Sequence, residues 1–229
     1  MINDLMSAAF WLAMAKIVWI NILLSGDNAV VIALAARNLS PDRQKPAIIF
    51  GSLGAIGLRI VLIFFAVALL ALPFLKLVGS ALLVWIGVQL LTGDENDKKI
   101  DPAHNLIAAI RTILIADLVM SIDNVLAIAA VAETAPESSR MLLLVFGLGL
   151  TIPLIMFGST MLLRLMERIP LIVTAGAGLL GFVAGEMAAS DPILARFGLG
   201  EGWRPYALGA FLAVVVIAVG SILARHRKA

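Results

Sequence analysis

The segment Asn21-Ile-Leu-Leu-Ser-Gly-Asp-Asn28 recurs 96 residues further along the chain as Asp117-Leu-Val-Met-Ser-Ile-Asp-Asn124. Both copies end in Ser-x-Asp-Asn, and both lie inside long apolar runs. The correspondence continues without a gap, since Phe50-Gly51 meets Phe146-Gly147 at the same offset. The chain is therefore predicted to contain an internal repeat, with one copy over residues 8–92 and a second copy over residues 106–189.

The composition indicates a membrane protein. Of the 229 residues, 62% are hydrophobic and 14% are charged, and the mean hydropathy is +1.05. A soluble domain carries about 25% charged residues, so a soluble enzyme, a nucleic-acid-binding protein and a disordered chain are all excluded. No nucleophile–base pair and no phosphate-binding glycine loop is evident, so we do not expect an enzyme. Because the apolar residues are spread over the whole length, residues 1–229 are expected to form a single transmembrane domain.

Seven apolar runs can be read, and each is near the length of about 20 residues that a spanning helix needs. They lie near residues 8–35, 46–72, 75–92, 106–132, 141–163, 170–189 and 206–224. The expected fold is all-α, with seven transmembrane helices arranged as two three-helix repeats and an added seventh helix at 206–224. Three crossings leave the chain on the opposite side of the membrane, so the second repeat is inserted upside down, as in many secondary transporters.

The basic residues predict the orientation of the spans. With seven spans, eleven Lys and Arg residues fall on one side and four on the other, while Lys16 and Arg59 lie inside spans. Cytoplasmic loops carry the excess of basic residues in membrane proteins. We expect a multi-pass protein of the inner (plasma) membrane, with its N-terminus outside and its C-terminus in the cytoplasm.

Acids inside the spans are the candidate functional groups. Asp27, Asp117 and Asp123 lie within apolar runs, and Glu186 lies near the outer end of the sixth run. An Asp at the centre of a spanning helix costs roughly 2.5–3.5 kcal/mol to insert, so such residues usually mark an ion or proton pathway. Asp27 and Asp123 lie roughly 120° from the stripe of their neighbouring polar residues, which requires either a broad polar face or local unwinding of the helix.

The side chains that could bind a metal limit which metal ions the protein could hold. Cysteine is absent, and His104 and His226 are the only histidines, so any metal must be held by oxygen atoms. Carboxylate and amide oxygens suit Mg²⁺, Ca²⁺ or Mn²⁺. Arg59, near the middle of the second run, is expected to pair with an acid, and Asp27 is the suggested partner. That leaves two or three acids for a cation or for protons.

The doubled Ser-x-Asp-Asn motif, each copy early in a three-helix repeat, resembles that of the TerC family of integral membrane proteins. The resemblance covers about residues 8–224 and implies a role in handling divalent cations, chiefly export of Mn²⁺ from the cytoplasm. It carries over five candidate metal-site positions, which are Asp27, Asn28, Asp117, Asp123 and Asn124. Asn21 departs from the pattern, because some members carry an acid there.

The combined prediction is a Mn²⁺ exporter with a carboxylate site at the repeat interface. Asp117, Asp123 and Glu186 are the preferred ligands, with Asp27, Asn28 and Asn124 as partners or ligands of a second site, and a proton is a candidate counter-ion. Asp117→Asn is expected to abolish export and leave a folded protein. Two alternatives stay open. One is an exporter of amino acids or small organic cations, and the other is a membrane scaffold that supports metal loading or assembly of other proteins.

Overall fold

The computed structural model describes residues 7–70, 74–92, 102–132 and 137–228. Over these residues the chain is helical, with no strands, and seven helices are 18 residues or longer. They are α2 (Ala8–Ala36), α3 (Pro41–Leu70), α4 (Leu75–Thr92), α5 (Pro102–Ala132), α6 (Glu137–Arg168), α7 (Leu171–Ala189) and α9 (Arg204–Lys228). Each coincides with one of the seven apolar runs, so the all-α class is confirmed. The short helix α8 (Pro192–Ala195) lies in the connection between α7 and α9.

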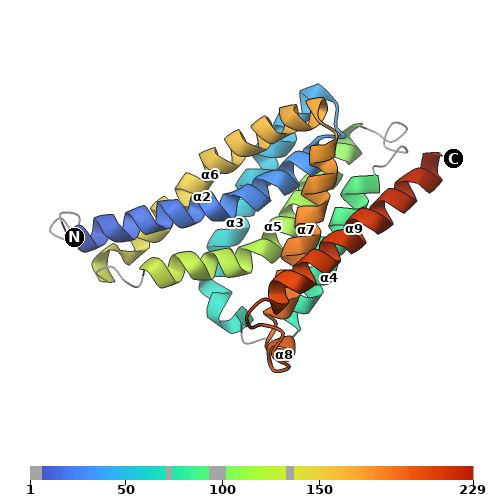
Figure 1. Cartoon of the computed structure of the whole chain (residues 1–229). Helices are drawn as coiled ribbons and strands as arrows, with labels where there is room; N and C mark the ends of the chain where they lie inside the picture. Colours follow the sequence, from blue (N-terminus) through green and yellow to red (C-terminus); the bar gives the residue numbers. More distant parts are fainter. Residues whose placement is uncertain (1–6, 71–73, 93–101, 133–136, 229) are drawn as a thin grey trace.

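The helices form two groups that share a central contact (Figure 1). Helices α2, α3, α5 and α6 make up one group, in which α2 packs on α6 and on α5, and α3 packs on α5. Helices α4, α7 and α9 make up the other, in which α7 packs on both α4 and α9, and α4 also packs on α9. The main core of buried side chains joins the groups through Leu34, Ile86, Ile113 and Leu180.

Four of the described helices are long and apolar enough to cross a membrane. These segments are Pro41–Leu62, Leu75–Thr92, Leu171–Ala189 and Arg204–His226. Helix α2 contains two shorter apolar stretches, Phe10–Trp19, which precedes the first polar motif, and Ser25–Ala36, which includes its Ser-Gly-Asp-Asn end. The full set of seven spans therefore remains a prediction.

Small residues set the closest helix contacts. A Cβ atom on Gly181 would lie 2.6 Å from the Leu212 carbonyl oxygen, and one on Gly185 would lie 2.5 Å from the Gly209 backbone. The Gly-x-x-x-Gly pattern at 181–185 is therefore a site of helix packing between α7 and α9. On α3, Gly51 and Gly54 similarly face side chains of α5, whereas a Cβ on Gly57 would meet nothing within 4 Å.

The turn after α7 is held by a buried carboxylate. Asp191 is fully buried and caps α8, because its Oδ1 accepts a hydrogen bond from the Ile193 backbone N–H at 3.0 Å. Its Oδ2 accepts from the Leu77 backbone N–H at 3.4 Å. One side chain thus satisfies backbone donors at the start of α8 and at the start of α4.

Candidate functional site

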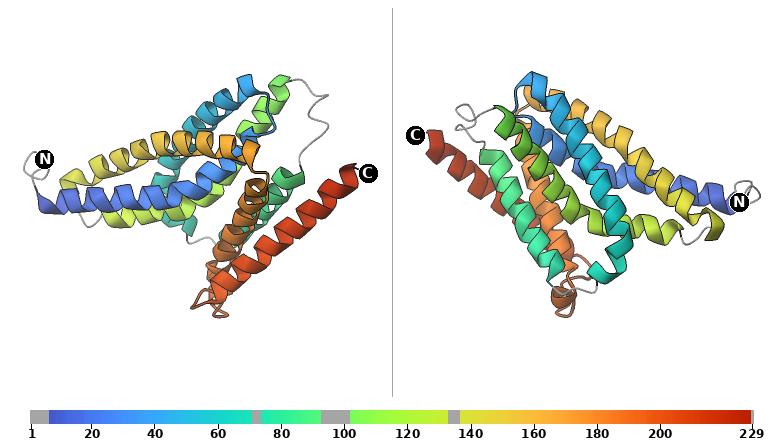
Figure 2. Two further views of the ribbon diagram at one scale, coloured as in Figure 1. Left: turned by 45° about the horizontal axis from the view of Figure 1, so that its top comes forward. Right: turned by 180° about the vertical axis from the view of Figure 1, so that it is seen from behind.

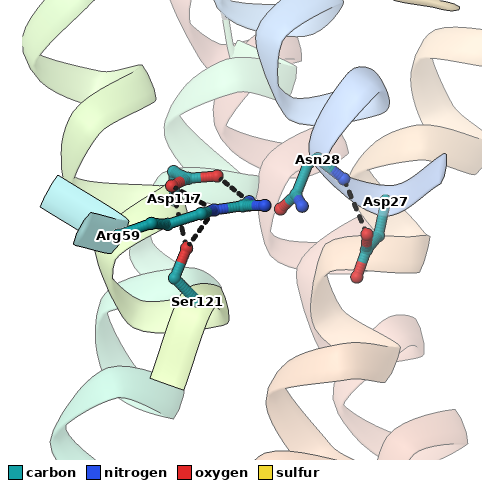
Figure 3. A network of polar contacts seen from close by, with 5 residues as sticks. All are labelled: Asp27, Asn28, Arg59, Asp117 and Ser121. Carbon is teal, nitrogen blue, oxygen red and sulfur yellow. Dashed lines mark hydrogen bonds and ion pairs between the residues drawn. The ribbon is translucent and has the colours of Figure 1, made fainter. Parts of the chain in front are cut away.

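Polar side chains from three helices meet inside the first helix group (Figure 3). Asp27 and Asn28 come from α2, Arg59 comes from α3, and Asp117 and Ser121 come from α5. Helix α2 runs without interruption through its motif, and α5 does the same. Local unwinding is therefore not what brings Asp27 to the site, and the broad polar face is the arrangement that the structure has.

Arg59 and Asp117 form a buried ion pair at the centre of this cluster. Arg59 Nη2 contacts Asp117 Oδ1, and Arg59 Nε donates to Asp117 Oδ2 at 3.2 Å. Ser121 completes the ring, since its Oγ accepts from Arg59 Nε at 2.7 Å and donates to Asp117 Oδ2 at 2.8 Å. Arg59 is 2% exposed and Asp117 is 3% exposed. A buried pair of this kind persists only when further hydrogen bonds satisfy the charged groups, and Ser121 supplies them.

The suggested pairing of Arg59 with Asp27 is wrong, because the guanidinium binds Asp117 instead. Arg59 and Asp117 both lie near the middle of their helices, and α3 packs along α5. Equal depth in two neighbouring spans was the sequence signal that could have identified this pair. The role of Ser121 as a bridge between the two charges follows from its position one turn after Asp117.

Asp27 is the acid in this cluster that has no basic partner among the described residues. Its Oδ1 accepts a hydrogen bond from the backbone N–H of Asn28 at 2.8 Å, and its side chain is half-buried. Figure 3 shows the Asn28 side chain turned toward the Arg59 guanidinium and the Asp27 carboxylate turned away from it. Asp27 still lies within electrostatic reach of Arg59 and Asp117. The cluster holds two carboxylates and one guanidinium, so it carries one excess negative charge when both carboxylates are ionised.

The remaining predicted ligands are not joined to this cluster. Glu186 lies half-buried on α7, and within the described part of the chain no hydrogen bond or ion pair links it to Asp27 or Asp117. The side chains of Asp123 and Asn124 lie outside the described residues. Over those that are described, no group of three acidic, histidine or cysteine residues is close enough to hold a metal. The proposed ligand set of Asp117, Asp123 and Glu186 therefore stays a prediction.

A polar pocket of about 430 Å³ opens at one end of α2, α4 and α5. Its polar lining side chains are Asn38, Gln89, Thr92, Asn105 and Thr112. Ile113 lies one residue beyond this lining on α5 and one turn before Asp117, and it is fully buried. Ile32 holds the corresponding place on α2, so along both helices a buried apolar side chain lies between the pocket lining and the polar cluster.

Comparison with known proteins identifies the family. The model of the integral membrane protein TerC family matches residues 6–229. The chain is 41% identical to the uncharacterised membrane protein YjbE of Bacillus subtilis, with 82% of this chain and 84% of that protein aligned. It is 26% identical to the membrane protein YceF of the same organism, over 79% of this chain and 72% of that protein. No solved structure matches the chain at a significant level.

Proposed function

The chain belongs to the TerC family of integral membrane proteins, and from that premise we propose that it exports a divalent cation, Mn²⁺, from the cytoplasm. The observation that carries the proposal is the half-buried Asp27 carboxylate, which has no described basic partner and lies beside a neutralised Arg59–Asp117 pair. An excess negative charge among apolar helices attracts a cation. Oxygen ligands suit Mn²⁺, with Mg²⁺ and Ca²⁺ as related candidates.

The helix packing supports an inverted-repeat transporter. If α2, α3 and α4 correspond to α5, α6 and α7, a two-fold relation predicts that contacts come in exchanged pairs. Helix α3 packs on α5 and α6 packs on α2, while α4 contacts α5 and α7 contacts α2. Each pair is the exchange that this relation requires. In such proteins the site lies near the middle of the membrane, where the two repeats meet. Asp27 and Asp117 come from α2 and α5, which pack on each other and are the first helices of the two proposed repeats.

Arg59 acts in this proposal as a resident cation. Without cargo, its guanidinium neutralises Asp117 and keeps a carboxylate from lying uncompensated in the bundle. A divalent cation at Asp27 brings two positive charges close to Arg59, and like charges repel more strongly in a medium of low dielectric constant. Cation binding therefore weakens the Arg59–Asp117 pair. Rearrangement of this pair is the step that would couple binding to movement of the repeats.

The polar pocket at the ends of α2, α4 and α5 fits the approach of a hydrated ion. Its amide and hydroxyl side chains offer oxygen atoms without a fixed charge, so an ion could reach it with most of its water retained. The apolar layer at Ile32 and Ile113 then lies between the pocket lining and the acids. In a transporter with alternating access, this layer would open when the repeats move.

Uptake of Mn²⁺ into inside-out membrane vesicles tests the proposal. Vesicles that contain the protein should accumulate Mn²⁺, and Asp27→Asn should abolish the accumulation at equal protein abundance. Asp42→Asn is the matched control, because Asp42 is an exposed acid paired with Arg43 at the start of α3. Accumulation of lysine or another organic amine in place of Mn²⁺ would favour the organic-cation exporter. Unchanged Mn²⁺ uptake in Asp27→Asn would show that this carboxylate is not part of the pathway.

A further inference from the structure

An open groove of about 810 Å³ runs between α3 and α6 on the outer surface of the bundle. The two helices converge at the end where α3 begins and α6 ends, and they diverge from there (Figure 2). The volume falls in the range of about 300–1,000 Å³ that is usual for ligand sites. The polar cluster around Asp27 and Asp117 contributes no residue to this groove.

Three basic side chains gather at the converging end of the groove. They are Lys45 on α3 and Arg164 and Arg168 on α6. Arg164 and Arg168 are four residues apart, so they lie on the same face of α6. None of the three forms an ion pair with a carboxylate in the described ranges, and no acid lines the groove. The converging end therefore presents uncompensated positive charge.

The wall beyond the basic end is apolar and open to the surroundings. Phe157 is 75% exposed and Met161 is 54% exposed, and both line the groove on the face of α6 that carries the two arginines. Ile48 and Ile49 form the opposite wall on α3. An apolar groove that ends in a basic cluster is complementary to a phospholipid, which has apolar chains at one end and a negatively charged phosphate at the other.

We propose that this groove binds one anionic phospholipid. Its acyl chain lies along Phe157 and Met161, and its phosphate group contacts Lys45, Arg164 and Arg168. Basic pockets between transmembrane helices are a common means of holding anionic headgroups. The assignment does not depend on the transported ion, because no residue of the polar cluster lines the groove.

Lipid binding to the purified full-length chain tests this site. The protein is stripped of lipid in detergent and titrated with phosphatidylglycerol or with phosphatidylcholine of the same acyl chains, and bound lipid is counted by native mass spectrometry. We expect one phosphatidylglycerol to bind in preference to phosphatidylcholine. Arg164→Gln with Arg168→Gln should reduce that preference by about fivefold for each cation removed.

Two further variants distinguish binding in the groove from a general attraction of anionic lipid to a basic protein. Arg196→Gln with Arg225→Gln removes the same charge from exposed positions outside the groove and should leave the preference unchanged. Met161→Trp places a larger ring in the groove at an already exposed position, and it should reduce binding of both lipids. The arginine variants thus test binding of the lipid headgroup, and Met161→Trp tests binding of the acyl chain.

Four outcomes would overturn the proposal. Equal binding of the two lipids by the unmodified protein would remove the role of the basic cluster. An equal loss in both double variants would indicate unspecific attraction. Displacement of phosphatidylglycerol by inorganic phosphate alone would assign a phosphate site instead of a lipid site. A dimer that forms in place of the lipid adduct, and that Met161→Trp disrupts, would assign the groove to a second copy of the chain.

Discussion

At the scale of single residues, the Arg59–Asp117 pair changes what a substitution at Asp117 is expected to do. The sequence alone predicted that Asp117→Asn would leave a folded protein, because an amide is easier to bury than a carboxylate. In the structure the carboxylate is the counter-charge of a guanidinium that is 2% exposed. Removing one partner of a buried pair leaves the other charge uncompensated, which is strongly destabilising.

Asp117→Asn is therefore expected to lower the free energy of unfolding by about 3–5 kcal/mol, as is typical when one partner of a buried pair is removed. Arg59→Gln should have a similar effect. The double variant Arg59→Gln with Asp117→Asn should recover part of the loss, since no charge is then left buried. Thermal unfolding in detergent, followed by tryptophan fluorescence, measures all three. Additive losses in the double variant would contradict the pair.

The two motif serines provide a matched comparison. Ser121 Oγ both accepts from Arg59 and donates to Asp117, whereas Ser25 Oγ is buried with no hydrogen-bond partner among the described residues. Ser121→Ala should lower the free energy of unfolding by about 1–3 kcal/mol, the usual effect of losing hydrogen bonds to charged groups. Ser25→Ala should leave it unchanged or raise it slightly. The same unfolding assay distinguishes the two, and equal effects would argue against the bridging role of Ser121.

At the scale of helices, apolar periodicity located the elements well and the polar cluster only in part. The runs at 75–92 and 170–189 end within one residue of α4 and α7, because Pro, Gly and charged residues bound them. Helices α3 and α6 extend beyond their apolar runs, since polar residues such as Asp42 and Arg168 continue the helix outside the apolar part. Helix α8 was not predicted, because four residues carry no periodicity.

The close packing of α7 on α9 predicts that a larger residue at Gly185 destabilises the protein. Gly185→Ala places a Cβ 2.5 Å from the Gly209 backbone, where no side chain can move aside. We expect the free energy of unfolding to fall by about 1–3 kcal/mol, as in other overpacked interiors. Gly57→Ala is the control, since its Cβ meets nothing within 4 Å, and the better helix propensity of Ala should stabilise α3 by up to about 1 kcal/mol. Similar melting temperatures for the two variants would contradict the close contact.

At the scale of the whole molecule, the repeat pointed to polar residues of which Ser25, Asn28, Asp117 and Ser121 are buried in the structure, but it did not predict which of them would pair. An offset of 96 residues relates Asn21 to Asp117 and Asp27 to Asp123, and it carries no information on the distance between α3 and α5. The Arg59–Asp117 contact depends on that packing. Arg59 also has no basic counterpart in the second repeat, where Ile155 stands at the same offset. The repeat is thus asymmetric at the charge that matters most to the cluster.

The orientation of the bundle is the last prediction, and it rests on the eleven basic residues on one side against four on the other. Figure 1 shows the α2–α3 turn, the α6–α7 turn and the C-terminus toward the same end of the molecule. Basic segments stay in the cytoplasm because moving them across the membrane is unfavourable. The C-terminus should then be cytoplasmic and the N-terminus external.

Single cysteines in this cysteine-free chain test the orientation directly. A membrane-impermeant maleimide should label Asn3→Cys and Glu137→Cys in intact cells, and it should label Lys98→Cys and Arg227→Cys only after permeabilisation. Asn3 precedes the first helix of the first repeat and Lys98 precedes the first helix of the second repeat, so opposite accessibility of these two positions requires an odd number of crossings between them. Repeats of the same orientation would place both of these positions on one side of the membrane, whereas inverted repeats place them on opposite sides. Helices α2, α3, α4 and α5 separate Asn3 from Glu137, so external labelling of these two positions requires an even number of crossings. External labelling of position 98 would show that the protein has the opposite orientation. The basic end of the groove between α3 and α6 would then lie at the external side of the membrane.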